Sequence, residues 1–202
     1  MRYLVDYIYG MFVTPSRTSA LIAARKPIGT AALVLLVISL ISGLAAFMEK
    51  SKETAAIPGG AIPALLILVL ILAFVGWFLR SAILHFLAQL MGGVGSPKSL
   101  LCIVAFVELP AILMAPAILI SRFAGNWFFI VAELAIAIWS IVLTVIGVKA
   151  NYALSTGKSV LVVLLPGIVA VAVVIVFVLL VFIAMVPFMG DIMRSMPTGG
   201  MY

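Results

Sequence analysis

Charged residues are scarce in this sequence, and cysteine and histidine are nearly absent. Charged residues make up 9% of the 202 residues and hydrophobic residues 66%, whereas soluble domains are about a quarter charged and about half apolar. The one cysteine, Cys102, excludes an internal disulfide and a thiolate metal cluster. The one histidine, His85, makes no metal site by itself. The longest polar interval, residues 49–60, is too short to fold alone, so no separate soluble domain is expected.

Long apolar runs fill most of the chain, whose mean hydropathy is +1.42. A hydrocarbon core about 30 Å thick takes about 20 residues per helical span, and a helix satisfies its own backbone hydrogen bonds there. The sequence therefore predicts an all-α, polytopic transmembrane bundle of about five spans over residues 27–202. The predicted spans are 28–47, 61–80, 99–120, 127–148 and 159–187.

Residues 1–26 combine aromatic and basic residues and resemble an amphipathic helix that lies on the membrane. Asp6 and polar breaks interrupt the apolar stretch that a signal peptide needs, so we expect the segment to stay in the chain. The residues predicted to meet the lipid interface and its anionic headgroups are Tyr3, Tyr7, Phe12, Arg17, Arg25 and Lys26. The alternative is a helix that packs on the end of the bundle.

The basic residues stand singly at span ends, a pattern that favours membrane topology and lipid phosphate over nucleic acid. With the N-terminus cytoplasmic, that side receives Arg2, Arg17, Arg25, Lys26, Arg80, Lys98, Lys149 and Lys158. The other side receives Lys50, Lys52, Arg122 and Arg194. The positive-inside tendency therefore predicts a cytoplasmic N-terminus.

Two acidic residues fall inside predicted spans, where a charge is costly and therefore informative. Glu108 lies about 14 Å into the third span at 1.5 Å per residue, so it must be protonated, partnered or hydrated. Pro110 removes the donor to the carbonyl of Phe106, and Pro116 leaves that of Ile112 free. A carboxylate beside such carbonyls could hold a cation or a proton.

Glu133 enters the fourth span roughly 9 Å from its outer edge, and His85 follows the second span. We therefore take Glu108, Pro110, Glu133 and His85 as a candidate intramembrane polar or ion site. The alternative is structural: the two acids are neutral and hydrogen-bonded between helices, and His85 is an interfacial hydrogen-bonding residue. No paired Ser/His/Asp set, HExxH motif or acid cluster occurs, so we expect no enzyme and no cofactor.

Three local motifs stand out near the ends of the predicted spans. The first is Phe12-Val-Thr-Pro15-Ser-Arg-Thr18, with Pro27 before the first span. The second is His85-Phe-Leu-Ala-Gln-Leu-Met-Gly92-Gly93-Val-Gly-Ser, with Glu108-Leu-Pro110 in the following span. The third is Gly157-Lys158-Ser-Val-Leu-Val-Val-Leu-Leu-Pro166. Together these motifs resemble the Yip (Ypt-interacting protein) domain family of five-span membrane proteins.

The resemblance implies a five-span fold and a non-enzymatic protein that organises or shapes membrane or acts as an adaptor in membrane traffic. Small prokaryotic members of the family imply a place in the plasma membrane of a prokaryote. The expected partners are membrane lipids with anionic headgroups, and another membrane protein or a second copy of the chain, but no nucleic acid. The rival function is a small ion- or proton-coupled transporter or channel that uses Glu108 and Glu133.

Overall fold

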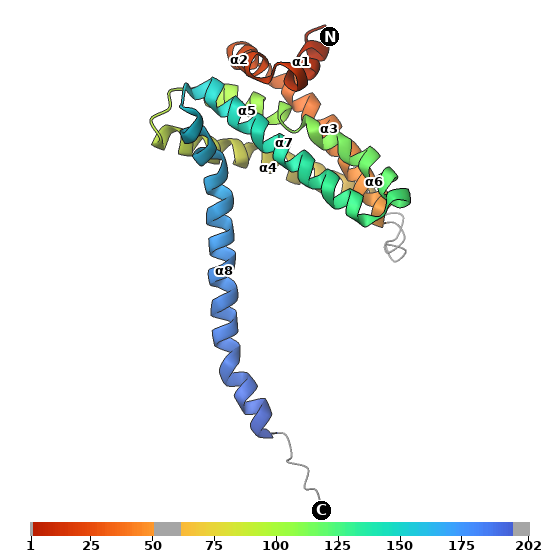
Figure 1. Ribbon diagram of the computed structural model, residues 1–202, viewed down its shortest axis with the longest axis vertical. Coiled ribbons are helices and arrows are strands. Elements are labelled where there is room, and N and C mark those ends of the chain that lie inside the picture. Colours follow the sequence, from red (N-terminus) through yellow and green to blue (C-terminus); the bar gives the residue numbers. More distant parts are fainter. Residues whose placement is uncertain (1, 51–61, 196–202) are drawn as a thin grey trace, which may run out of the picture. The chain divides into compact units, whose positions relative to one another are not determined.

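The computed structural model describes the backbone of residues 2–50 and 62–195, and the side chains of residues 4–45 and 63–185. Within these ranges the chain is helical, without strands (Figure 1). The elements are α1 (Arg2–Val13), α2 (Pro15–Arg25), α3 (Ile28–Lys50), α4 (Ile62–Leu90), α5 (Pro97–Phe106), η2 (Leu109–Leu113), α6 (Met114–Ala124), α7 (Asn126–Tyr152) and α8 (Thr156–Ser195).

Five segments of the described chain are long and apolar enough to cross a membrane. They are Ile28–Ala45, Pro63–Leu90, Pro97–Ala124, Asn126–Tyr152 and Thr156–Met185. The third segment joins α5, η2 and α6, because η2 is a single 3-10 helix between two α-helices. The prediction of an all-α bundle with about five spans and a short N-terminal helix is confirmed.

The chain divides into two compact units, residues 1–163 and residues 164–202. In the first unit α5 is the central helix, since it contacts α1, α2, α3, α4 and α7. Seven of its ten residues are buried, among them Cys102 and Phe106. Because other helices surround α5, polar side chains from several of them can meet near its end, at Glu108.

The second unit continues helix α8 from Leu164. Every described side chain from Gly167 to Met185 is exposed within this unit. The helix continues without interruption past Pro166. In a membrane such an all-round apolar surface faces lipid or another helix.

A glycine-rich turn between α4 and α5 packs on the end of α7. Gly92 has a φ of +81°, which suits a glycine in the turn that follows α4. A Cβ on Gly95 would lie 2.6 Å from the carbonyl oxygen of Asn151, so this position has no room for a side chain. The turn is also tied by Asn151 Nδ2, which donates to the carbonyl of Ser96 at 3.0 Å.

Candidate intramembrane polar site

The break in the third span positions Glu108. Helix α5 ends at Phe106, and Glu108 immediately precedes η2, in which Pro110 is the second residue. The N–H of Ala111 donates to the carbonyl of Glu108 at 2.9 Å, as a 3-10 turn requires. The N–H of Met114 reaches the carbonyls of Ala111 and Ile112. The expectation of a free Ile112 carbonyl was therefore wrong, because the chain tightens into a 3-10 helix before Pro116.

Glu108 is partnered by Arg80 of α4. Arg80 Nη1 donates to Glu108 Oε1 in an ion pair, and Arg80 Nη2 donates to Thr144 Oγ1 of α7 at 3.1 Å. Thr144 Oγ1 in turn donates to the carbonyl of Ser140 at 2.7 Å. The side chains of Arg80 and Glu108 are 40% and 28% exposed, whereas Thr144 is buried. One polar chain thus joins α4, the break in the third span, and α7.

Sequence reasoning missed Arg80, which it assigned to the membrane surface at the end of a span over 61–80. Helix α4 continues beyond Arg80 to Leu90, so Arg80 lies about 15 Å before the helix ends, at 1.5 Å per residue. The sequence held two signals for this position. No glycine or proline occurs in residues 81–90, and the next span contains an acid, Glu108, that needs a partner. Together they favour an intramembrane ion pair.

A cavity of about 290 Å³ lies beside the ion pair. Its polar wall comes from Ser39 and Ser42 of α3, Arg80 and Glu108, and its other walls are mostly apolar. Ser42 Oγ is buried and has no hydrogen-bond partner among the described residues. The cavity therefore combines a carboxylate, a guanidinium and two hydroxyls in an apolar setting, which suits a small polar group or water.

The structure does not bring the other predicted site residues to this cavity. Glu133 is exposed on α7 and does not line it. His85 is further along α4, where its Nδ1 shares a hydrogen bond of 2.5 Å with the hydroxyl of buried Tyr152. Pro110 is buried in η2 next to Glu108. Among the described residues, no three His, Cys, Asp or Glu side chains are placed to hold a metal ion.

The N-terminal helices pack on the bundle, as the alternative interpretation of residues 1–26 proposed. Helix α2 contacts α5 and α7. Tyr7 was assigned to the lipid interface, but it is buried and packs edge-on against Phe106, with ring centroids 5.6 Å apart. Its hydroxyl accepts a hydrogen bond from Arg25 Nη1 at 3.5 Å. That assignment was wrong because the helix turns Tyr7 toward α5.

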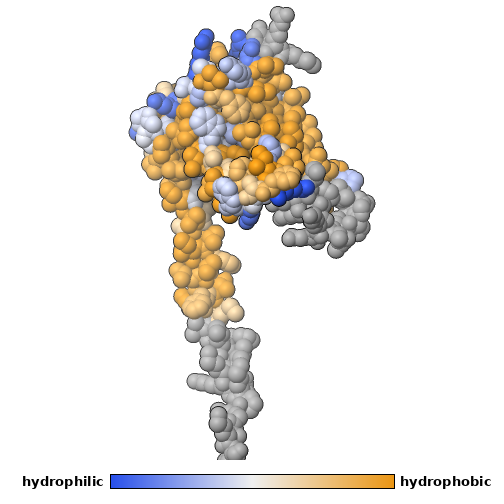
Figure 2. Space-filling view, turned by 45° about the vertical axis from the view of Figure 1, so that its right-hand side comes forward, coloured by the Kyte–Doolittle hydropathy of each residue, from blue (hydrophilic) through white to orange (hydrophobic). Residues whose placement is uncertain are grey.

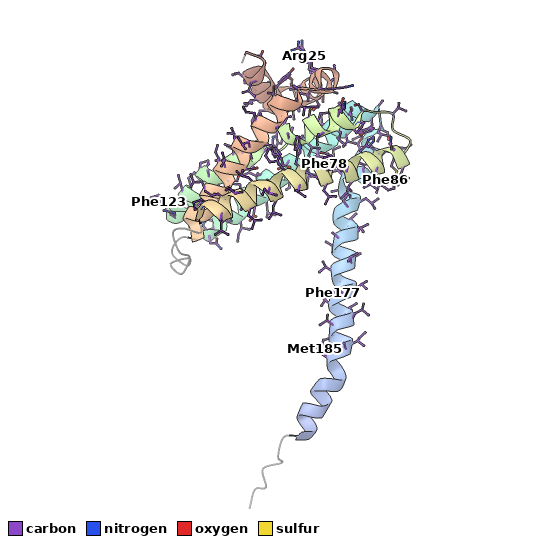
Figure 3. The ribbon with its side chains drawn as sticks, turned by 180° about the vertical axis from the view of Figure 1, so that it is seen from behind. Arg25, Phe78, Phe86, Phe123, Phe177 and Met185 are labelled. Carbon is purple, nitrogen blue, oxygen red and sulfur yellow. The ribbon has the colours of Figure 1, made fainter. Side chains whose placement is uncertain are left out.

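The other residues assigned to the lipid interface lie on the outside of unit 1. Phe12, Arg17, Arg25 and Lys26 are exposed, and Figure 3 labels Arg25 at the N-terminal end. The side chain of Tyr3 lies outside the described residues. Figure 2 shows hydrophilic side chains gathered near this end of the unit, with apolar surface along its flank.

These features define a polytopic helical membrane protein with a polar chain across three of its spans. The Yip1 domain model matches residues 9–180, so the chain belongs to the Yip1 domain family. The resemblance found in the three sequence motifs is thereby confirmed. No curated protein and no solved structure matches the chain.

Proposed function

We propose that this Yip-type protein is non-enzymatic and organises or shapes the membrane through its N-terminal helices, α1 and α2. The observation that carries the proposal is an outward apolar stripe on α1, formed by Val5, Tyr9, Phe12 and Val13. These residues are 67%, 67%, 39% and 56% exposed. Their spacing of three and four residues places them on one helix face.

The opposite face of α1 is anchored to the bundle through Tyr7 and Met11, which are buried. The Cβ of a larger residue at Gly10 would meet Thr18 of α2, so α1 and α2 pack closely. A stripe held in this way, with the exposed cations Arg17 and Lys26 nearby, fits the headgroup boundary of one leaflet. When side chains insert into just one leaflet, that leaflet expands relative to the other, and this favours curvature of the bilayer.

The test uses full-length protein reconstituted into vesicles that contain anionic lipid. Val5→Gln combined with Tyr9→Gln makes the two most exposed positions of the stripe polar, and Val94→Gln is the control because Val94 is 88% exposed in the turn before α5. We expect smaller vesicles by electron cryomicroscopy for the wild type and the control than for the double variant, at equal protein content. Equal diameters for all three would contradict the proposal.

An adaptor role belongs to the same proposal and rests on the apolar surface of α8. A second membrane protein or a second copy of the chain could cover the residues between Gly167 and Met185, all of which are exposed within their unit. Single cysteines at Val171 and Val178, in a Cys102→Ala background, would be cross-linked in native membranes. A discrete cross-linked species supports the adaptor role, and uncross-linked protein alone contradicts it.

The second candidate function is an ion- or proton-coupled transporter or channel, favoured by the cavity that reaches Glu108. Against it, the Arg80 guanidinium offsets the negative charge that a bound cation would need. Glu108→Gln keeps the shape of the side chain and removes its charge. If transport is the function, this change abolishes ion-dependent flux in reconstituted vesicles. If Glu108 is structural, the same change leaves any flux unchanged and lowers the thermal stability of the protein.

A further inference from the structure

A second cavity, of about 230 Å³, lies between α4 and α5. Its apolar wall includes Phe78, Ala82 and Leu101, and its polar residues include His85 and Lys98. Trp77 Nε1 donates to the carbonyl of Leu101 at 2.8 Å, and Trp77 lines the cavity at Glu108. This hydrogen bond therefore joins a residue that lines one cavity to a residue that lines the other.

The surface of the cavity is mostly apolar, and its two basic residues, His85 and Lys98, lie toward one end of the spans. Lys98 is the second residue of the third span, and Leu101 lies one helical turn further in. On the antiparallel α4, Phe78 precedes His85 by seven residues, about 10 Å of helix. Figure 3 shows Phe78 on α4, where it is 66% exposed and so forms an outer edge of the cavity.

The histidine ring is held by a buried tyrosine. His85 Nδ1 and the Tyr152 hydroxyl are 2.5 Å apart, and the ring centroids are 5.8 Å apart. When the hydroxyl donates to Nδ1, the hydrogen of the neutral ring is on Nε2, which is then a donor. His85, held at Nδ1 by Tyr152, and the exposed residue Lys98 thus both line one cavity whose lining contains no acid.

We propose that this cavity binds an anionic phospholipid. The phosphate lies at Lys98 and His85, at the membrane boundary, and the upper part of one acyl chain lies against Phe78, Ala82 and Leu101. Charge complementarity favours an anionic headgroup, because Lys98 is a cation and no acidic residue lines the cavity. A volume below the range of 300–1,000 Å³ that is typical of drug-sized ligand sites suits one part of a lipid.

The test uses quenching of Trp77 fluorescence by lipids with brominated acyl chains. Trp127→Phe and Trp139→Phe leave Trp77, beside the cavity, as the remaining tryptophan in the full-length protein, whose sequence has three. The protein is reconstituted in phosphatidylcholine vesicles with brominated phosphatidylglycerol or brominated phosphatidylcholine. We expect about a fivefold preference for phosphatidylglycerol, the factor for one lysine near an anionic surface.

Three variants separate the headgroup contact, the chain contact and diffuse surface charge. Lys98→Gln should abolish the preference for phosphatidylglycerol. Ala82→Phe, at an exposed position, should fill the apolar part and reduce quenching by both lipids. Lys149→Gln, the matched control, removes an exposed cation that does not line the cavity and should keep the preference.

The proposal is overturned by equal quenching from both lipids in the parent protein. An equal loss of preference in Lys149→Gln and Lys98→Gln would also overturn it, because the preference would then reflect the charged surface as a whole. Unchanged quenching in Ala82→Phe would remove the acyl-chain contact. None of these results depends on the stripe of α1, so the proposal fails or stands independently of the proposed function.

Discussion

Arg80 and Glu108 lie 28 residues apart in the sequence and form an ion pair inside the membrane-spanning part of the molecule. The pair ties α4 to the break in the third span, and Thr144 extends it to α7. Both side chains also line the neighbouring cavity. The acid that the sequence left as either functional or structural thus has a cationic partner.

Removal of one charge should destabilise the protein more than removal of both. Glu108→Gln leaves the Arg80 guanidinium without its carboxylate, for which we expect a loss of about 2 kcal/mol of unfolding free energy. Arg80→Met combined with Glu108→Gln should recover part of that loss. Unfolding in detergent micelles measures Glu108→Gln, the double variant and Arg80→Met alone. Strictly additive losses would show that the two side chains are not coupled.

Thr144→Val tests the contact with α7. The change keeps the shape of the side chain and removes the oxygen that accepts from Arg80 Nη2, so we expect a loss of about 1 kcal/mol. Thr156→Val is the matched control, since Thr156 Oγ1 accepts from Lys149 Nζ at an exposed position and should contribute little. The same unfolding measurement compares them. An equal effect of both changes would contradict a special role for the buried hydroxyl.

Gly95→Ala should destabilise the turn between α4 and α5. The added Cβ would lie 2.6 Å from the Asn151 carbonyl oxygen, and overpacking of this kind costs about 1–3 kcal/mol. Gly76→Ala, in the middle of α4, meets nothing within 4 Å and should stabilise the helix by roughly 0.5–1 kcal/mol. Melting temperatures of the two variants should therefore shift in opposite directions. A shift of the same sign in both would show that the turn can adapt.

The predicted orientation places the turn before α5 in the cytoplasm. Single cysteines in a Cys102→Ala background test it, and Val94 and Phe123 are suited because they are 88% and 94% exposed near opposite ends of the third span. We expect an impermeant maleimide to label Phe123→Cys in intact cells and Val94→Cys only after lysis. Ser96, in the same turn, should behave as Val94 does. The reverse pattern would invert the topology.

Labelling at Ser51 and Ser195 extends this test to the ends of two other spans. Both cysteines should react from outside intact cells if the N-terminus is cytoplasmic. Ser51 and the side chain of Ser195 lie outside the described residues, so these two expectations rest on the distribution of cations in the sequence alone.

The sequence by itself determined the class of the protein, its five spans and its family. Hydrocarbon permits few backbone structures and requires about 20 apolar residues per crossing, so the runs from Ile28, Pro97 and Asn126 could be recognised without tertiary information. Proline at 110 likewise marked the break in the third span, because its missing N–H interrupts the helix wherever the helix packs.

Only the tertiary structure decided which side chains meet. Arg80 pairs with Glu108 and not with headgroups, Tyr7 turns toward Phe106, and Glu133 stays on the outside of α7. Hydropathy and span length give the depth of a residue in the membrane, but they do not give the rotation of its helix. A helix that is apolar on every side has no polar face to indicate which side points outward. Rotation is set by close packing against neighbouring helices, which is a property of residues far apart in the sequence.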